Sequence, residues 1–375
     1  MKIANIAGAR PNFIKIAPIL REMHKCSEVS PILIHTGQHY DLEMAGQFFR
    51  DLKIPKPDVS LEVGSGSHAY QTAEVMKRLE PVLEEICPDL VLVVGDVNST
   101  LAAAVTAAKL LIPVAHVEAG LRSFDCTMPE EINRLLTDAV SEYLFVSEES
   151  GRQNLLREGV NQSKIFFVGN VMIDSLAECR PLWERSDICG RLGLRKRGYG
   201  VVTLHRPSNV DDPETFHGLV ESLAKIATQL PLLFPMHPRT SARVKEFGLE
   251  EHFNFLSVGS VVNSRLSGLY CLDPLGYLEF MSLMADSRLV LTDSGGLQEE
   301  TTMLGVPCLT LRENTERPVT ISHGTNTLVG VSSNRITSEA SRVLATTQPV
   351  TTPPPLWDGQ AAERIVTVLR EHLST

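Results

Sequence analysis

The residues of this chain that could do acid/base chemistry gather between positions 116 and 134. The stretch contains a histidine, several carboxylates and two arginines, and it reads His116-Val117-Glu118-Ala119-Gly120-Leu121-Arg122-Ser123 and then Met128-Pro129-Glu130-Glu131-Ile132-Asn133-Arg134. A strand pattern precedes it and a helix pattern follows it, which is where open α/β sheets bind ligands. Grouped carboxylates and a histidine suit removal of a proton from a weakly acidic carbon, because general bases must be positioned and desolvated for that step.

Two apolar runs, 89–94 and 114–117, are predicted to be buried parallel strands. Asp96 follows the first run and Glu118 follows the second. Because parallel strands end at the same edge of a sheet, we expect these two carboxylates to lie at one edge. An alternative stays open for Asp96, which could be an ordinary turn or cap aspartate.

The remaining elements of this region have structural alternatives as well. Ser99 or Thr100 is placed to cap an alanine-rich helix at 101–111. Glu130 and Glu131 fall in the first turn of a helix that Pro129 can open, where the helix dipole favours acidic residues whatever their function. Arg134, one turn later on the same face, favours a functional interpretation.

Two other corners of the predicted fold could bind anions. Arg10 and Lys15 follow the short apolar strand 2–7 at a strand–turn–helix corner, although both could simply be solvated cations. In the second half, the segment 292–300 passes from a strand through small residues into a helix, which leaves backbone N–H groups free to bind phosphate. His205 ends another strand, and a lone histidine is more often structural, but an arginine stands beside it.

The length of 375 residues and the alternation of strand and helix patterns predict an α/β protein with two Rossmann-like domains. We place the first domain at 1–170, a charged connector at 171–198, a second domain at 199–355 that would bind the diphosphate of a nucleotide compound, and a terminal helix at 356–375 that could pack back on the first domain. The predicted site is the cleft that the two domains face. The segment 250–268 shows no clear period and is interpreted as an inserted loop.

Composition excludes several classes of function. A formal charge of −10 argues against a nucleic-acid or membrane-surface protein, and no signal peptide or membrane span is visible, so we expect a cytoplasmic protein. The seven cysteines form no Cys-x-x-Cys pair and are interpreted as reduced. No Gly-x-Gly-x-x-Gly, P-loop or His-Glu-x-x-His motif is present, so neither a dinucleotide cofactor nor a metal is predicted.

Taken together, the motifs resemble the non-hydrolysing UDP-N-acetylglucosamine 2-epimerases. The matching stretches follow the family's order along nearly the whole chain: Gly8-Ala9-Arg10-Pro11 through Lys15-Ile16-Ala17-Pro18, Gly95-Asp96, residues 116–122, residues 129–134, His205-Arg206, Asp273-Pro274, residues 292–300, and Thr315-Glu316-Arg317-Pro318. The resemblance implies a GT-B fold, no cofactor, a homodimer, and interconversion of UDP-GlcNAc and UDP-ManNAc. UDP would leave by anti elimination to give a 2-acetamidoglucal and then add back.

The resemblance also assigns roles by position. Acid/base catalysis falls to Asp96, Glu118 and Glu130, and His205 corresponds to the histidine on the diphosphate side. Substrate binding falls to Arg10, Lys15, Arg134, Arg206, Pro274, Tyr277, Ser294, Gly295, Gly296, Glu300 and Arg317. Within the last group, Ser294, Gly295 and Gly296 would hold phosphate and Glu300 the ribose hydroxyls.

The sequence departs from the family pattern at four places: Gln38-His39-Tyr40-Asp41, His205-Arg206-Pro207-Ser208-Asn209, residues 250–268, and Leu356-Trp357-Asp358-Gly359. At the first of these, many members carry part of an activating UDP-GlcNAc site.

Because of these departures, four alternative functions stay open. They are an epimerase for another UDP-2-acetamido sugar such as a 2,3-diacetamido uronate, a hydrolysing epimerase, a GT-B glycosyltransferase and a non-catalytic nucleotide-sugar sensor.

Overall fold

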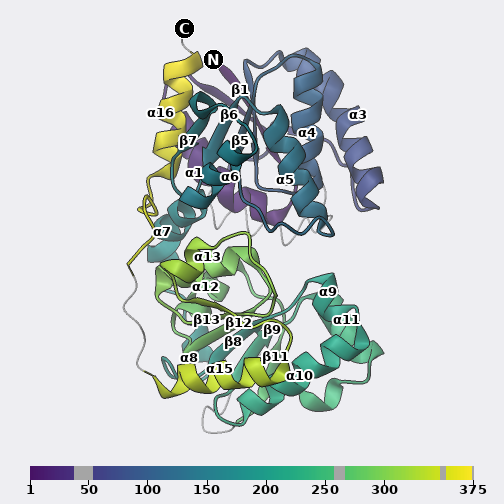
Figure 1. Ribbon diagram of the computed structural model, residues 1–375, viewed down its shortest axis with the longest axis vertical. Coiled ribbons are helices and arrows are strands. Elements are labelled where there is room, and N and C mark those ends of the chain that lie inside the picture. Colours follow the sequence, from purple (N-terminus) through teal and green to yellow (C-terminus); the bar gives the residue numbers. More distant parts are fainter. Residues whose placement is uncertain (38–53, 257–266, 347–351, 374–375) are drawn as a thin grey trace. The chain divides into compact units, whose positions relative to one another are not determined.

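The computed structural model describes residues 1–37, 54–256, 267–346 and 352–373, which belong to two compact units (Figure 1). The first unit comprises Met1–Glu178 and Pro355–Thr375, and the second comprises Cys179–Pro354. Each unit contains a seven-stranded sheet flanked by helices, so the predicted α/β class is confirmed. No helix in these described ranges is long and apolar enough to cross a membrane.

The first sheet is parallel throughout. Its strands, in spatial order, are β3 (Val59–Ser60), β2 (Ser30–His35), β1 (Lys2–Ala7), β4 (Leu90–Val94), β5 (Val114–Val117), β6 (Tyr143–Val146) and β7 (Ile165–Phe167). Every residue of β4 is buried, as expected of a central strand covered on both faces. Since β4 and β5 are parallel neighbours, the residues that follow them lie at the same edge of the sheet.

The helices of the first unit are α1 (Arg10–His24), α3 (His68–Ile86), α4 (Asn98–Lys109), α5 (Pro129–Val140), α6 (Glu149–Arg157), α7 (Val171–Trp183, which runs into the second unit) and α16 (Ala361–Leu373). The alanine-rich helix α4 packs between α3 and α5. Its small side chains pack against Val91 and Val93 of β4 in one apolar cluster. Small residues on α4 therefore let both neighbouring helices pack closely against it.

The predicted cap of helix α4 is wrong. The helix begins at Asn98, three residues earlier than expected, and its N-cap position is Val97, which makes no side-chain cap hydrogen bond. The Thr100 hydroxyl instead donates to the Val94 carbonyl at 2.9 Å, and the Ser99 hydroxyl lies 2.8 Å from that of Thr36. These hydroxyls tie α4 to the ends of the strands, a tertiary role that local capping rules do not foresee.

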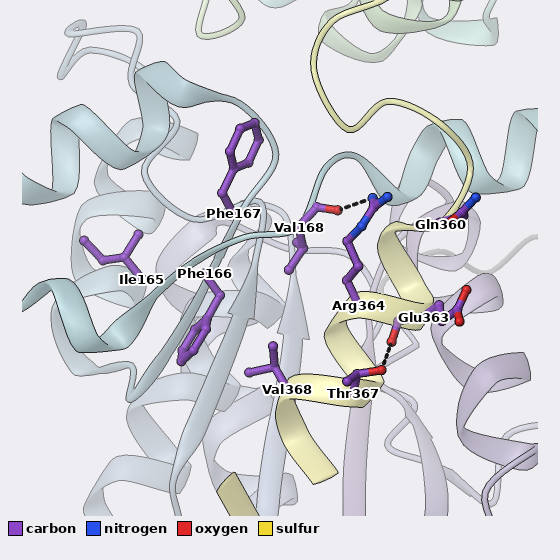
Figure 2. A pocket seen from close by; sticks show the side chains of 9 residues that line it. All are labelled: Ile165, Phe166, Phe167, Val168, Gln360, Glu363, Arg364, Thr367 and Val368. Carbon is purple, nitrogen blue, oxygen red and sulfur yellow. Dashed lines mark hydrogen bonds between the residues drawn. The ribbon is translucent and has the colours of Figure 1, made fainter. Parts of the chain in front are cut away.

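The last helix, α16, belongs to the first unit, where it packs against α1 (Figure 1). The indole N–H of Trp357, which is buried, donates to the Ser147 carbonyl at 2.9 Å. Asp174 on α7 accepts hydrogen bonds from the first backbone N–H groups of α16, those of Ala361 and Ala362. Figure 2 shows Arg364 of α16 donating to the carbonyl of Val168, just after the edge strand β7.

The second sheet is also parallel throughout. Its spatial order is β10 (Asn254–Phe255), β11 (Leu269–Leu272), β9 (Leu232–Pro235), β8 (Gly200–Thr203), β12 (Leu289–Thr292), β13 (Cys308–Thr310) and β14 (Asn326–Leu328). The helices are α8 (Ile188–Arg191), α9 (Pro207–Val210), α10 (Pro213–Ala227), α11 (Pro238–Glu246), α12 (Tyr277–Ala285), α13 (Gly295–Leu304), α14 (Val319–Ser322) and α15 (Ser333–Ala345). The sequence did not predict α9, β10, β14, α14 or α15, and β10 falls within the expected loop 250–268. Gln38–Asp41 and most of the expected loop 250–268 lie outside the described residues.

Candidate active site

A buried ion pair joins two of the predicted site residues in the first unit. Lys15 extends from α1, and its Nζ lies 2.6 Å from Oε2 of Glu118, which directly follows β5. The two side chains are only 7% and 3% exposed. A Cβ atom at Gly95 would stand 3.0 Å from the Lys15 amine, so the glycine leaves room for this pair. Burial makes the pairing necessary, because either charge alone would be strongly disfavoured there.

Arg134 connects the other carboxylates of the same edge. Its guanidinium lies 2.5 Å from Oδ2 of Asp96 and 2.5 Å from Oε2 of Glu131, and the arginine is 1% exposed. The Asn133 amide donates to the backbone carbonyl of Asp96 at 2.9 Å. Helix α5 thus holds both the side chain and the main chain of Asp96, whose side chain remains 24% exposed.

The adjacent glutamates Glu130 and Glu131 differ sharply in environment. Glu131 is buried and accepts hydrogen bonds from the backbone N–H and hydroxyl of Ser123 as well as from Arg134. Burial alone would raise the pKa of Glu131, but these hydrogen bonds and the Arg134 charge lower it below its ordinary value. Glu130 is half-buried, and its side chain forms no hydrogen bond with any residue that the structure describes. Glu131 therefore positions neighbouring groups, and Glu130 is the more accessible acid.

His116 lies in the interior of the first unit rather than at its accessible edge. It is fully buried on β5. Its ring nitrogens lie within hydrogen-bond distance of Asp138 on α5 and of the Gly95 carbonyl. The sequence identified His116 as part of the candidate site but gave no indication of Asp138, which is 22 residues away in the chain.

In the second unit, His205 follows β8 and pairs with a residue that the sequence analysis did not select. Its Nδ1 lies 2.9 Å from Oδ1 of Asp293, which follows β12 and is fully buried, whereas the His205 side chain is 50% exposed. Burial would raise the pKa of Asp293, but the His205 charge and the backbone N–H groups of His205 and Arg206 lower it. The one available signal was that Asp293 stands at a strand end, immediately before the Ser-Gly-Gly turn.

The start of α13 lies against a cluster of paired charges. A Cβ at Gly295 would fall 2.6 Å from a guanidinium nitrogen of Arg317 and 2.7 Å from Oε1 of Glu316. Arg317 is itself held by Glu316 and, at 2.7 Å, by Glu299. Arg206 donates to the backbone carbonyl of Asp293 at 2.9 Å. Two predicted arginines thus lie near the glycine turn that was predicted to bind phosphate.

The other predicted residues are distributed as follows. The Tyr277 hydroxyl lies 3.4 Å from Oε1 of Glu300, which brings these two buried residues together. Ser294 occupies the N-cap position of α13, where its hydroxyl makes no cap hydrogen bond, and Gly296 is in the first turn. Pro274 is exposed on the loop before α12, and Arg10 begins α1.

A hollow of about 550 Å³ lies elsewhere in the first unit, between β7 and α16. Figure 2 shows its lining, in which Phe166 and Val368 supply apolar surface and Arg364 and Glu363 supply charge. None of the predicted site residues lines it. We therefore do not assign the predicted chemistry to this hollow.

Comparisons with known proteins agree with the resemblance seen in the sequence. Residues 21–370 match the family model described as UDP-N-acetylglucosamine 2-epimerase. The UDP-N-acetylglucosamine 2-epimerase of Methanocaldococcus jannaschii is 42% identical over 374 residues, which cover 98% of this chain and 99% of that protein. A crystal structure of the M. jannaschii enzyme in complex with UDP-GlcNAc and UDP superposes with a TM-score of 0.89 at 41% identity, covering 99% of this chain and 100% of that one.

A relative with a different substrate name is almost equally similar. The UDP-2,3-diacetamido-2,3-dideoxy-D-glucuronate 2-epimerase of Pseudomonas aeruginosa is 41% identical over 351 residues, covering 92% of this chain and 93% of that protein. Overall identity therefore does not separate the two substrate classes.

Proposed function

The chain belongs to the UDP-N-acetylglucosamine 2-epimerase family, and from this premise we propose that it interconverts UDP-GlcNAc and UDP-ManNAc by inversion at C2. The observation that carries the proposal is the pair of carboxylates at one sheet edge, Glu118 beside Lys15 and Asp96 beside Arg134. Such groups can exchange a proton at a carbon without a redox cofactor.

The proposed reaction has two halves that mirror each other. A carboxylate of the first unit removes the C2 proton while the C1–O bond to the diphosphate breaks, so that a C1–C2 double bond forms and UDP leaves with the electron pair. UDP then adds back to C1 of the 2-acetamidoglucal, and C2 receives a proton on its other face. We assign the acid/base steps to Asp96, Glu118 and Glu130.

The fixed cations beside the carboxylates support this assignment. Lys15 and Arg134 are held by buried partners, so their charges are already in place when negative charge moves during the reaction. Preorganised charges of this kind stabilise a transition state without the cost of reorganisation.

In the second unit we assign UDP binding to the turn at the start of α13 and to the residues around it. Asp293 orients the His205 ring through Nδ1, which leaves Nε2 to contact an oxygen of the diphosphate. Gly295 and Gly296 bring backbone N–H groups to a helix start, an arrangement that favours phosphate. Arg206 and Arg317 add positive charge, and Glu300 with Tyr277 would hold the ribose.

A second candidate substrate is a UDP-2,3-diacetamido uronate, which the similarity to the P. aeruginosa relative favours. The experiment for both is incubation of each UDP sugar with the protein in deuterated water. The proposal predicts deuterium at C2 of both epimers, with faster turnover of UDP-GlcNAc. Unlabelled sugar after extended incubation would contradict an epimerase, free sugar would indicate a hydrolysing enzyme, and transfer to an added acceptor would indicate a glycosyltransferase.

We further propose that the protein is a homodimer that uses the outer face of α5. Ile132, Leu136 and Val140 follow one another at intervals of four residues and are 45%, 48% and 39% exposed. A hollow of about 360 Å³ lined by residues of α3 and α5, including Met76, adjoins Ile132. Exposed apolar stripes of this kind are typical of protein–protein contacts.

The cytoplasmic location expected from the sequence stays a prediction.

A further inference from the structure

A buried histidine–carboxylate pair links the two turns that carry Asp96 and Glu118. The His116 ring is completely buried, with Nδ1 at 2.6 Å from Oδ1 of Asp138 and Nε2 at 2.8 Å from the Gly95 carbonyl. A carbonyl oxygen can only accept, so Nε2 donates to Gly95. His116 thus connects helix α5 to the residue immediately before Asp96.

The Asp138 carboxylate also holds the turn that carries Glu118, through a direct hydrogen bond. The backbone N–H of Gly120 donates to the other oxygen of Asp138 at 3.0 Å. Gly120 and Glu118 have φ angles of 77° and 74°, both in the left-handed region that costs energy for a residue with a side chain. Glu118 therefore needs external support to keep its conformation, and the Asp138–Gly120 hydrogen bond supplies part of it, together with the Phe145 carbonyl, which accepts from the backbone N–H groups of Glu118 and Ala119.

Neighbouring side chains of the protein balance the negative charge of the Asp138 carboxylate. Arg122 approaches Asp138 at 2.7 Å and also forms two hydrogen bonds with Glu158, at 2.8 and 2.7 Å. Burial would raise the pKa of Asp138, but the charges and hydrogen bonds of His116 and Arg122 lower it. Asp138 is thus an ionised acceptor that can bind His116, Gly120 and Arg122 simultaneously.

We propose that His116 and Asp138 are positioning residues for the epimerase reaction, which fix the spacing of Asp96 and Glu118 from inside the protein. This inference rests on the proposed function of those two carboxylates. Neither positioning residue needs to touch the substrate. Their loss lowers the rate of proton transfer because misplacement of a reacting group by about 1 Å can cost about 100-fold in rate.

The test compares two substitutions of His116 that differ in the hydrogen bond they keep. In His116→Gln the amide nitrogen can reach the Gly95 carbonyl in place of Nε2, whereas in His116→Asn it can reach only Asp138 in place of Nδ1. Both remove the ring from the same cavity, so each serves as the structural control for the other. Asp138→Asn, which keeps the size of the side chain, is the second variant, and Glu142→Gln is the matched exposed carboxylate.

The measurements are kcat and KM for deuterium incorporation at C2, the Kd of UDP by calorimetry, and the midpoint of thermal unfolding. We expect His116→Asn and Asp138→Asn to lower kcat about 100-fold with the UDP Kd unchanged, and His116→Gln to retain at least about tenfold more activity than His116→Asn. Three results would overturn the positioning role. They are equal losses of kcat in the two His116 variants, losses of kcat that unfolding of the variants explains entirely, and no loss of kcat. If the His116 variants do not fold, Asp138→Asn decides, and failure of all three to fold would make the role purely structural.

Deuterium incorporation by the wild-type protein tests the proposed function separately. Wild-type protein that incorporates no deuterium contradicts the epimerase activity itself, whereas an active wild type with unaffected variants contradicts only the positioning role. The two failures are therefore distinguishable in one experiment.

Discussion

The Nζ atom of Lys15 and the Oε2 atom of Glu118 lie 2.6 Å apart, although the residues are separated by 103 positions in the chain. Lys15 comes from α1 and Glu118 from the end of β5, so the contact exists only once the parallel sheet has formed. It neutralises a carboxylate that is almost fully buried.

Replacing Lys15 with methionine is expected to destabilise the protein by about 3–5 kcal/mol, because it leaves the Glu118 charge buried without a partner. The double variant Lys15→Met/Glu118→Gln should recover part of that loss, since the remaining groups are neutral. Urea unfolding of the two single variants, the double variant and the wild type measures the coupling. Additive effects of the two substitutions would show that the pair does not stabilise the fold.

Asp96→Asn is expected to reduce deuterium incorporation at C2 by at least about 100-fold, since an amide cannot serve as a general acid or base. UDP binding should stay within about threefold, because we assign it to the second unit, and calorimetry checks this. Glu85→Gln on α3 is the control, since Glu85 is exposed. Normal exchange by the Asp96 variant would remove this residue from the mechanism.

Gly295→Ala is expected to weaken UDP binding at least about tenfold and to cost about 1–3 kcal/mol of stability. The added methyl group would approach Arg317 and Glu316 within 2.7 Å, and neither can move without disturbing a buried ion pair. Gly218→Ala is the matched control, because nothing lies within 4 Å of its Cβ position in α10. UDP affinity equal to that of the wild type would refute the assignment of this turn.

Asp174→Asn is expected to change how stability depends on pH. Burial raises the pKa of Asp174 to about 6 from a reference value of 3.8, despite the hydrogen bonds from Ala362 and Ala361. The folded state therefore binds the proton more tightly than the unfolded state, so this residue's contribution to stability is greatest below about pH 4 and declines as the pH rises to about 6.

The asparagine variant should thus gain about 1–1.5 kcal/mol relative to the wild type between pH 5 and pH 7.5. Urea unfolding at both pH values is the measurement. Identical pH slopes for the two proteins would show that Asp174 titrates normally.

Leu136→Glu is expected to convert the proposed homodimer to a monomer, because it places a charge in the apolar stripe of α5. Light scattering after gel filtration gives the mass of each form. Leu111→Glu is the control, since Leu111 is 91% exposed and lies outside this stripe. A wild-type protein that is already monomeric would contradict the homodimer.

The strand ends were predictable from the sequence because the signal is local. Apolar runs such as 89–94 and 114–117 mark buried parallel strands, and in the structure Glu118 directly follows β5 while Asp96 is the second residue after β4. The same reasoning located the helix that begins at Pro129 and placed Arg134 on the face where it meets Glu131. The hydrophobic period of these segments and the order of the strands together therefore identify the edge of the sheet at which the carboxylates lie.

The partners of these residues were not predictable, because they depend on packing between distant segments. Asp138 and Asp293 occupy positions that resemble an ordinary helix residue and an ordinary turn residue, and only the fold brings them to His116 and His205. The misassigned cap at Ser99 has the same origin, since its hydroxyl bonds to Thr36 across the sheet. β14 was missed because Asn326–Leu328 is too short to show a period.

The return of the chain to its first unit affects the order in which the two units can be completed. A ribosome delivers α16 only after every residue of the second unit, yet α16 packs on α1 and accepts support from Asp174. During synthesis, the second unit can reach its final contacts while the first still lacks one of its helices. A nascent chain stalled before residue 355 would therefore leave the face of α1 that binds α16 open to chaperones.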